Sequence, residues 1–277
     1  MTRGRAVLMS LLFAFAAQLL ARAAPAQVLS VDLSSDITFE SVLGSHDHEA
    51  VLRLALPGPP EVEDLGSLPA NADLTAFHRL DGGLRLFSLD TFVELPGGVV
   101  ADRDDVVQYD GAGYAVLLDG SGAGLPDGAR IDALGWRREG GVAALLLSTD
   151  VTVELPGGLV AEDEDVVAWD GAAWSLVLDG SAAGVADGLD LDGIDRDPVT
   201  GVLFVSFDGS GNLNGLDFDD DDALAWDGAT WSLAFSGDLL GASFAAGDLD
   251  ALGVLTSNIF RDGFESSDTI EWSAAVP

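Results

Sequence analysis

The sequence contains no cysteine and no lysine, so each of its 12 basic residues is an arginine. Without cysteine the chain forms no disulfides, and its stability must come from a hydrophobic core or from bound ions. Apart from one run near the N-terminus, no stretch is apolar over the ~20 residues that a membrane-spanning helix needs, so we expect no membrane insertion.

Positive charge is scarce, because 47 acidic residues face only 12 basic ones. A surface this acidic repels nucleic acid and anionic lipid, which excludes both as partners. It also destabilises the compact state by self-repulsion unless cations or salt screen it. Disorder does not explain the composition, since 48% of the residues are hydrophobic, and disordered acidic chains have few such residues.

The N-terminus has the three parts of a secretory signal peptide. Arg3 and Arg5 precede an apolar run over residues 6–21, and an A-x-A cleavage pattern follows at residues 24–26. We therefore predict a signal peptide at residues 1–26 and a secreted or periplasmic protein. A membrane anchor is the alternative, but the apolar run is shorter than a span requires. Removing residues 1–26 leaves 9 arginines against 47 acids, a net charge of −38.

A segment of about sixty residues repeats along the chain. The sequence V-E-L-P-G-G at residues 93–98 recurs at 153–158, and an aromatic-Asp-Gly-Ala motif occurs at 109–112, 169–172 and 226–229. A degraded fourth copy begins at residues 34–40, which align with 148–154. Such a period indicates units that bury their apolar faces only against their neighbours.

Each repeat is predicted to form two β-hairpins. In one copy the first hairpin pairs residues 131–136 with 142–148, and the second pairs 165–169 with 174–178 across an Asp-Gly turn. Asp-Gly between apolar runs favours a hairpin, because glycine supplies the positive φ that the turn needs. The strands are rich in Val, Leu and Trp and show little alternation of apolar and polar residues, as expected when both faces of the sheet are covered.

Four strands per repeat predict the blade of a β-propeller. First strands begin at residues 72, 131, 191 and 249, and second strands begin at 28, 84, 142 and 202. Because the chain opens with a second strand and supplies the missing first strand at its far end, the two should pair and close a ring. An open solenoid or a distorted sandwich is the alternative.

The predicted fold class is therefore all-β, a β-propeller-like closed ring of four repeats of about 57–60 residues with four antiparallel strands each. The repeat domain covers residues 27–255, with units at about 28–83, 84–141, 142–201 and 202–255, and a tail occupies 256–277.

Acidic residues recur at two positions of the repeat. One group ends the second strand, and the other lies just before the third strand. Since the two groups flank one Gly/Pro loop, we predict that they bind Ca²⁺, which takes six to eight oxygen ligands. The predicted metal ligands are Asp36, Asp90, Asp150, Asp208, Asp104, Asp105, Glu164, Asp165, Asp221 and Asp222. The alternative is a solvated acidic rim, because no stretch has the D-x-[DN]-x-[DN]-G spacing of a known calcium loop.

Other chemistry has weaker support in the sequence. His46 and His48 alternate along one segment and suit a transition metal, but only His78 remains to complete a site. No G-x-S-x-G motif is present, and we assign no catalytic residue. The repeated aromatics either stack on a sugar or pair across strands, and their recurrence in each full repeat favours pairing. They are Tyr109, Tyr114, Trp169, Trp174, Trp226 and Trp231.

Residues 259–273 read I-F-R-D-G-F-E-S-S-D-T-I-E-W-S. This resembles a short C-terminal segment, I-F-x-D-G-F-E-S-G-D-T-x-x-W-S, that occurs on many otherwise unrelated exported proteins of Gram-negative bacteria. Ser267 departs from the glycine of that pattern. The resemblance implies export and a bacterial source, and it implies no activity. The repeats are also similar to those of uncharacterised secreted bacterial proteins.

The sequence thus predicts a secreted, non-enzymatic module that binds a protein or carbohydrate ligand at a surface, with Ca²⁺ as a stabilising ion. The alternative is a propeller hydrolase whose carboxylates surround a metal in the ring channel. The two differ in geometry, since a hydrolase needs carboxylates of different units at one axial place, whereas structural calcium needs one acidic site per unit. A third interpretation is adaptation to high salt.

Overall fold

The structure is a computed structural model that describes residues 27–34, 39–41, 44–46, 50–55, 61–80, 82–240 and 247–257. The predicted signal peptide at residues 1–26 and the tail motif at 259–273 lie outside these residues. Residues Ser30–Leu255 form one compact unit, to which the following description applies. Among the described residues, no helix is long and apolar enough to cross a membrane.

Four sheets of four strands are the main elements of this unit. We call them blades 1 to 4 and give the strands of each from the centre outward. Blade 1 contains β24 (Ala251–Ser257), β1 (Gln27–Ser34), β4 (Leu52–Ala55) and β5 (Glu61–Val62). Blade 2 contains β6 (Leu74–Arg79), β7 (Arg85–Leu89), β10 (Val106–Tyr109) and β11 (Tyr114–Leu118). Blade 3 contains β12 (Ile131–Glu139), β13 (Val142–Thr149), β16 (Val166–Trp169) and β17 (Trp174–Leu178). Blade 4 contains β18 (Leu191–Arg196), β19 (Leu203–Phe207), β22 (Ala223–Trp226) and β23 (Trp231–Phe235).

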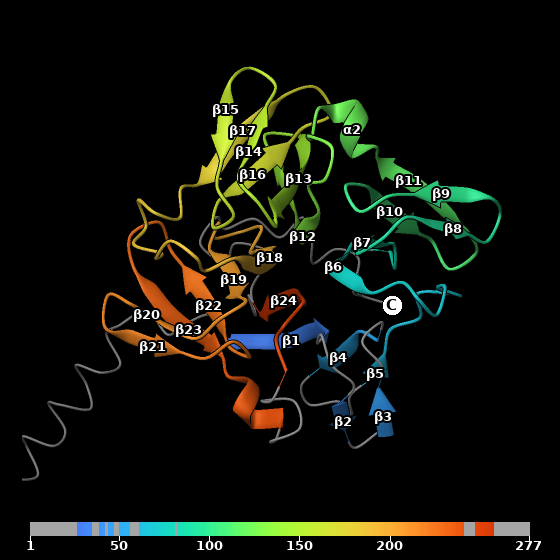
Figure 1. The fold of residues 1–277 in the computed structure, drawn as a ribbon. Coiled ribbons are helices and arrows are strands. Elements are labelled where there is room, and N and C mark those ends of the chain that lie inside the picture. The colour runs from blue at the N-terminus through green and yellow to red at the C-terminus, as the bar shows by residue number, and fades with distance from the viewer. Residues whose placement is uncertain are drawn as a thin grey trace, which may run out of the picture. The chain divides into compact units, whose positions relative to one another are not determined.

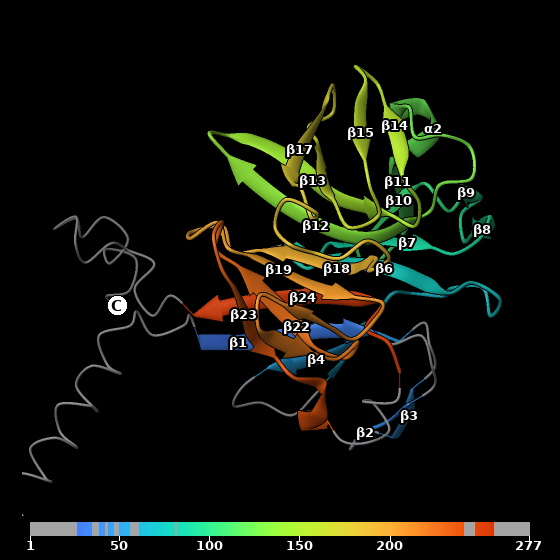
Figure 2. The same ribbon diagram turned by 60° about the vertical axis from the view of Figure 1, so that its left-hand side comes forward.

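The blades form a ring, with β6, β12, β18 and β24 around its axis (Figures 1 and 2). Closure occurs in blade 1, where β24 and β1, the last and the first of the described strands, lie side by side. The predicted fold class is confirmed, and the protein is a four-bladed β-propeller. Closing the sheet in this way removes an unpaired inner edge.

Each repeat also contains a third, shorter hairpin between its second and third strands. The sequence predicted a loop here, and that prediction was incomplete. The hairpins are β2–β3 (Phe39–Ser41, Gly44–His46), β8–β9 (Val93–Leu95, Val99–Ala101), β14–β15 (Val153–Leu155, Leu159–Ala161) and β20–β21 (Gly211–Leu213, Leu216–Phe218). Strands of three residues are too short to give a recognisable alternating pattern. Gly97 and Gly98 make one of the turns at φ 90° and 76°, a conformation that favours glycine.

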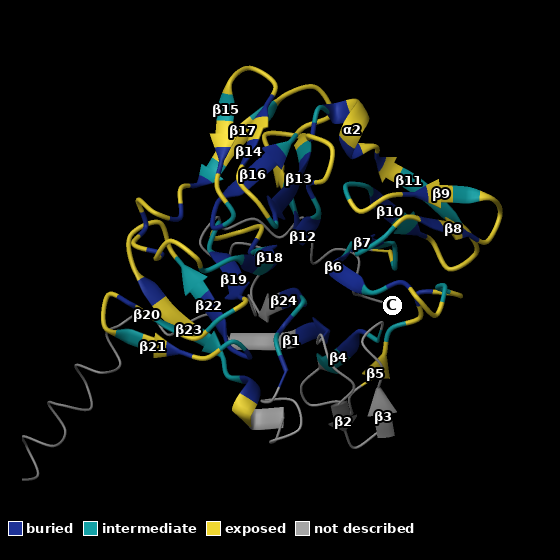
Figure 3. Ribbon diagram, viewed as in Figure 1, coloured by how far each residue is buried: buried dark blue, intermediate teal, exposed yellow. Residues whose placement is uncertain are grey.

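The inner strands pack closely around the axis, and most of their described residues are buried (Figure 3). Glycine makes this approach feasible. A Cβ atom on Gly135 of blade 3 would lie 3.0 Å from the carbonyl oxygen of Ile194 in blade 4, and one on Gly193 would lie 2.6 Å from Cβ of Leu252 in blade 1. Larger residues at these points would push neighbouring blades apart.

The repeated aromatics pair across the outer strands, as their recurrence predicted. Ring centroids are 4.8 Å apart for Tyr109 and Tyr114, and 5.0 Å apart for Trp169 and Trp174. The outer partner also reaches the preceding blade. Trp174 Nε1 donates to the carbonyl of Ala123 in α2 (Gly120–Ala123), at 2.9 Å. Trp231 makes the equivalent bond to Ala183, also at 2.9 Å. These side chains join blade to blade and are unavailable as free stacking platforms.

Candidate functional site

The predicted ligands at the end of the second strands bind backbone amides. Asp150 Oδ1 accepts the N–H of Arg130 at 2.8 Å, and its own N–H donates to the Arg130 carbonyl at 3.1 Å. Asp90 and Asp208 make the same pair of bonds with Asp73 and Asp190. Each carboxylate therefore closes the ends of the two inner strands. Asp36, the fourth member, lies outside the described residues.

The acids immediately before the third strands also bind backbone. Asp165 Oδ2 accepts the N–H of Glu162 at 3.0 Å, and its Oδ1 accepts the N–H of Gly180 at 2.8 Å. Asp105 repeats both bonds in blade 2, to the N–H groups of Asp102 and Gly120. Asp222 Oδ2 accepts the N–H of Asp219 at 3.1 Å. These carboxylates fix the loop and, in blades 2 and 3, tie it to the turn that follows the outer strand.

The preceding acid of each loop packs against the glycine of that turn. A Cβ on Gly180 would lie 2.4 Å from Cγ of Glu164, and one on Gly237 would lie 2.4 Å from Asp221 Oδ2. Burial raises the pKa of Glu164 to about 7 and that of Asp221 to about 6, and it also raises the pKa of Asp104. The predicted ligands thus contact different backbone segments, and among the described residues no group of three or more His, Cys, Asp or Glu is placed to hold a metal ion. Their assignment to Ca²⁺ stays a prediction. His46 lies in β3, and His48 lies outside the described residues.

A different set of acids meets at the axis, where the inner strands begin. The electrostatic neighbours of Asp192 include acids of blades 1, 3 and 4. Burial is the largest cause of the raised pKa of Asp192, and the charges of these neighbouring acids are the next largest. We call this group the axial acidic cluster, and it consists of Asp132, Asp190, Asp192, Asp248 and Asp250. Burial and the neighbouring charges also raise the pKa of Asp190 and of Asp132. Crowding of carboxylates disfavours their charged forms.

Arg130 is a counter-ion within this cluster. Its Nε atom lies 2.6 Å from Asp132 Oδ1 and 3.8 Å from Asp150 Oδ2. The other three repeats have no cation at this position, because the residue aligned with Arg130 is aspartate in each of them. Asp73, Asp190 and Asp248 occupy the position. Acid therefore accumulates towards blades 4 and 1.

Two oxygens of the cluster are buried without a hydrogen-bond donor. They are Oδ2 of Asp132, a residue that is only 3% exposed, and Oδ2 of Asp192. A buried carboxylate oxygen without a donor is costly. The sequence does contain a signal for these acids, since Asp132, Asp192 and Asp250 occupy the same position of three repeats. A ring brings these positions together, whereas the linear sequence separates them by about sixty residues.

His78 and Asp195 form a second buried polar contact, from β6 of blade 2 to β18 of blade 4. His78 Nδ1 lies 3.6 Å from Asp195 Oδ1. Asp195 also accepts the backbone N–H groups of Arg196 and Val254, so it links inner strands of three blades. Burial lowers the pKa of His78 to about 4 and raises that of Asp195 to about 7. His78 is therefore neutral at pH 7 and serves as part of the core.

Comparison with known proteins identifies no family for this chain. No protein-family model matches the sequence, and the search of curated proteins gives no match. Three similar solved structures are an extracellular domain from B. thetaiotaomicron, virginiamycin B lyase from Staphylococcus aureus, and a six-bladed β-propeller lectin of Aleuria aurantia. Their identities to this chain are 10%, 7% and 11%, with TM-scores of 0.34, 0.32 and 0.34.

The matches cover 84%, 74% and 84% of this chain and 38%, 69% and 90% of the respective structures. This chain therefore spans well under half of the B. thetaiotaomicron domain. At such low TM-scores, no activity of these proteins is transferred to it.

Proposed function

We propose that this protein is a secreted, non-enzymatic binding module that holds a cationic group of a protein or surface ligand at the axial acidic cluster. The convergence of acids from three blades at one end of the ring carries the proposal. Secretion rests on the N-terminal sequence, with its basic start, apolar run and A-x-A pattern.

Arg130 illustrates how a cation is held at this end of the ring. Its guanidinium contacts Asp132 at 2.6 Å in blade 3, whereas the corresponding residue of blade 4 is Asp190. An arginine or lysine of a partner would supply there the charge that the repeat supplies in blade 3. Guanidinium groups suit carboxylates because they donate two parallel hydrogen bonds. An acidic end also speeds the approach of a basic partner.

Calcium is the stabilising ion in this proposal. No three of the described carboxylates are placed to coordinate a metal ion together, so in this proposal calcium acts at this end of the ring through the attraction between its charge and the acidic cluster. An ion that binds only the folded state raises its stability. The same field therefore serves an ion or the basic group of a partner, and the two would compete.

The test measures binding of a fluorescent arginine hexapeptide by anisotropy, at fixed ionic strength and with calcium chelated. We expect saturable binding that Ca²⁺ displaces and that Asp192→Asn weakens. The matched control is Glu154→Gln, which removes one exposed acid from β14. An equal loss of peptide affinity in both variants would show that the peptide is attracted to the overall charge of the protein and not to the cluster, and this result would overturn the proposal.

A hydrolase is the second candidate function, because carboxylates of different units do converge at the axis. Asp192, with its strongly raised pKa, has the property required of a general acid. Turnover of a panel of chromogenic glycosides and esters, lost in Asp192→Asn and retained in Glu154→Gln, would support it. The absence of turnover with and without Ca²⁺ would remove it.

A further inference from the structure

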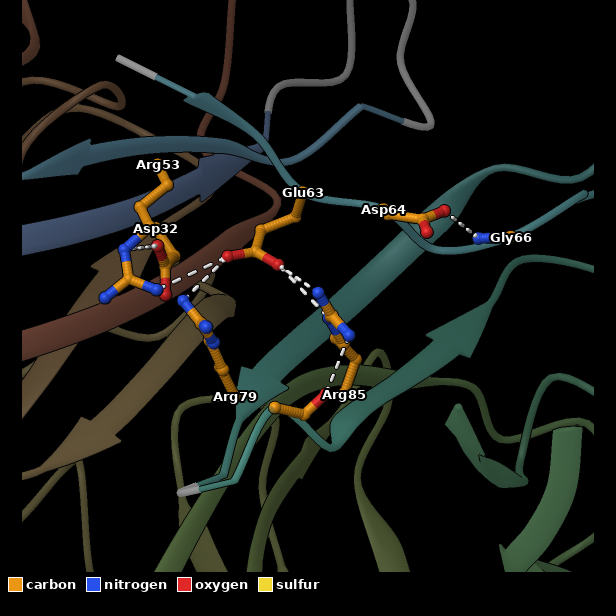
Figure 4. Close-up of polar contacts among 8 residues, drawn as sticks. Asp32, Arg53, Glu63, Asp64, Gly66, Arg79 and Arg85 are labelled. Carbon is orange, nitrogen blue, oxygen red and sulfur yellow. Dashed lines mark hydrogen bonds and ion pairs between the residues drawn. The ribbon is translucent and has the colours of Figure 1, made fainter. Parts of the chain in front are cut away.

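A compact group of arginines lies at the other end of the inner strand β6 from the axial acidic cluster. Arg53 of blade 1 and Arg79 and Arg85 of blade 2 surround the carboxylate of Glu63 (Figure 4). The Nη1 atoms of Arg53 and Arg79 lie 3.4 and 2.9 Å from Glu63 Oε1, and Arg85 Nε lies 3.1 Å from Oε2. We call these three residues the arginine cluster.

The arginine cluster carries more positive charge than Glu63 needs. One guanidinium neutralises one carboxylate, so two cations remain, in a chain where acids outnumber arginines 47 to 12. Asp32 lies 3.8 Å from Arg53. Its burial raises its pKa to about 7, although Arg53 opposes the shift, and a substantial share of it is uncharged at neutral pH.

Two further acids lie on neighbouring positions. Glu61 is exposed and opposite Arg53 in the strand register. Asp64 points away from the cluster, and its Oδ1 accepts the N–H of Gly66 at 2.9 Å (Figure 4). The guanidiniums of Arg79 and Arg85 therefore have Glu63 as their only carboxylate within 4.0 Å among the described residues.

The three side chains are held in place but still reach solvent. Their exposed fractions are 21% for Arg53, 29% for Arg79 and 17% for Arg85, whereas that of Glu63 is 7%. Arg79 and Arg85 are register partners at the end of one hairpin. Each guanidinium has five N–H donors, and the hydrogen bonds to Glu63 use only some of the donors of the three arginines. Side chains fixed before binding lose little entropy when a ligand arrives.

We propose that the arginine cluster binds an oxyanion, a carboxylate, sulfate or phosphate group, with Glu63 holding the guanidiniums apart and in position. Arginine is the side chain best suited to these planar or tetrahedral anions. This site is independent of the cation site proposed above, since it uses other residues at the other end of β6. The alternative is that the ion pairs of Glu63 only hold blade 1 against blade 2, in which case no anion binds.

The test is a calorimetric titration with sodium sulfate at a constant ionic strength of about 0.15 M, which limits the reach of the overall negative charge to ~8 Å. We expect saturable binding that Arg79→Gln weakens about tenfold, the effect of one charge-assisted hydrogen bond. Arg138→Gln is the matched control, because Arg138 is an exposed arginine of the corresponding hairpin in blade 3 and is not part of the arginine cluster. The affinity of that control should not change.

A second variant separates binding from clamping. Glu63→Gln removes the carboxylate that competes with the anion, so this variant should bind sulfate more tightly than the wild type. Added sulfate should also raise the melting temperature of Glu63→Gln by more than it raises that of the wild type. If Glu63→Gln does not fold, the comparison of Arg79→Gln with Arg138→Gln still decides. No saturable binding, or equal weakening in both arginine variants, would overturn the proposal.

Parallel titrations identify the source of the anion. Inorganic phosphate tests for a free ion, and trigalacturonate, with maltotriose as its neutral counterpart, tests for an acidic glycan. Tighter binding of trigalacturonate than of sulfate would assign the site to glycans, whereas binding of the inorganic ions alone would assign it to free anions.

Discussion

Asp165 and Asp192 lie in neighbouring blades, and neither is fully exposed, yet their surroundings differ. Asp165 accepts backbone N–H groups on both oxygens. Asp192 has an Oδ2 atom without a donor, and burial together with neighbouring aspartates raises its pKa to about 11. The two acids differ both in N–H donors and in neighbouring charge, and burial, donors and neighbouring charges together decide whether an acid stabilises this fold or opposes it.

The largest expected effect tests the first half of this comparison. Asp165→Ala removes the acceptor of Glu162 and Gly180 and leaves two N–H groups unpaired, so it should lower the free energy of unfolding by about 2–4 kcal/mol. Urea denaturation measures the loss. Glu154→Ala, at an exposed acid of the same blade, should change stability by less than about 0.5 kcal/mol. Similar losses in both variants would contradict a role specific to Asp165.

The pH dependence of stability tests whether buried acids oppose folding at neutral pH. Burial raises the pKa of Asp195 and of Asp32 to about 7, from 3.8. Between about pH 4 and 7 the folded state therefore binds more protons than the unfolded state, and stability falls as pH rises. His78 opposes this between about pH 4 and 6.5, because its pKa is lowered to about 4 and the unfolded state holds the extra proton.

Two acids outweigh one histidine, so the melting temperature should be several degrees higher at pH 5 than at pH 7 without divalent ions. Asp170, in an exposed turn, has a pKa lowered by hydrogen bonds from Ala173 and Ala172, so it titrates below this window. Calorimetry at the two pH values measures the difference, and Asp195→Asn should reduce it. A higher melting temperature at pH 7 would contradict the assignment.

Replacing an axial carboxyl should stabilise the protein, the opposite of the result at Asp165. The pKa of Asp192 is about 11 in the folded protein and 3.8 as its ordinary value, so at pH 8 folding must protonate this carboxyl, which lowers stability. Asp192→Asn removes that cost, and a gain of about 1 kcal/mol would raise the melting temperature by about 2–4 °C. The measurement is a thermal melt at pH 8 with calcium chelated, where the cost of protonation is large. A clear loss of stability would show that Asp192 makes structural bonds comparable to those of Asp165.

The smallest expected effect concerns the contacts between blades. Trp174→Phe keeps the ring against Trp169 but loses the N–H donor to the Ala123 carbonyl. The expected cost is about 1 kcal/mol, a typical net hydrogen bond. Trp169→Phe is the control, since Trp169 makes no hydrogen bond to another blade among the described residues, and it should cost less. The reverse order would indicate that ring packing outweighs the hydrogen bond.

Much of this fold could be predicted from the residues that repeat. The Asp-Gly turns and the split of first and last strands identified four blades and their closure, because turn chemistry and strand order are local. The third hairpin was missed because V-E-L and V-V-A are three-residue strands. The axial acids were missed for a different reason, since Asp132 and Asp192 are single acids within apolar strands. Their significance depends on a distance that only the closed ring creates.

The two acidic positions that the sequence did identify, such as Asp150 and Asp165, turned out to bind backbone. Recurrence alone did not separate them from ligands, because a structural carboxylate is repeated as faithfully as a functional one. The hydrogen bonds of each carboxylate oxygen distinguish a structural acid from a metal ligand, and these bonds cannot be read from the sequence.

The number of calcium ions bound per chain tests the central claim most directly. Isothermal titration of the wild type at fixed ionic strength should give about one ion per chain, because the crowded carboxylates lie in a single axial cluster, and Asp192→Asn should weaken that binding. About four equivalent ions per chain, unchanged in Asp192→Asn, would place the sites in the loops of each repeat and contradict the account.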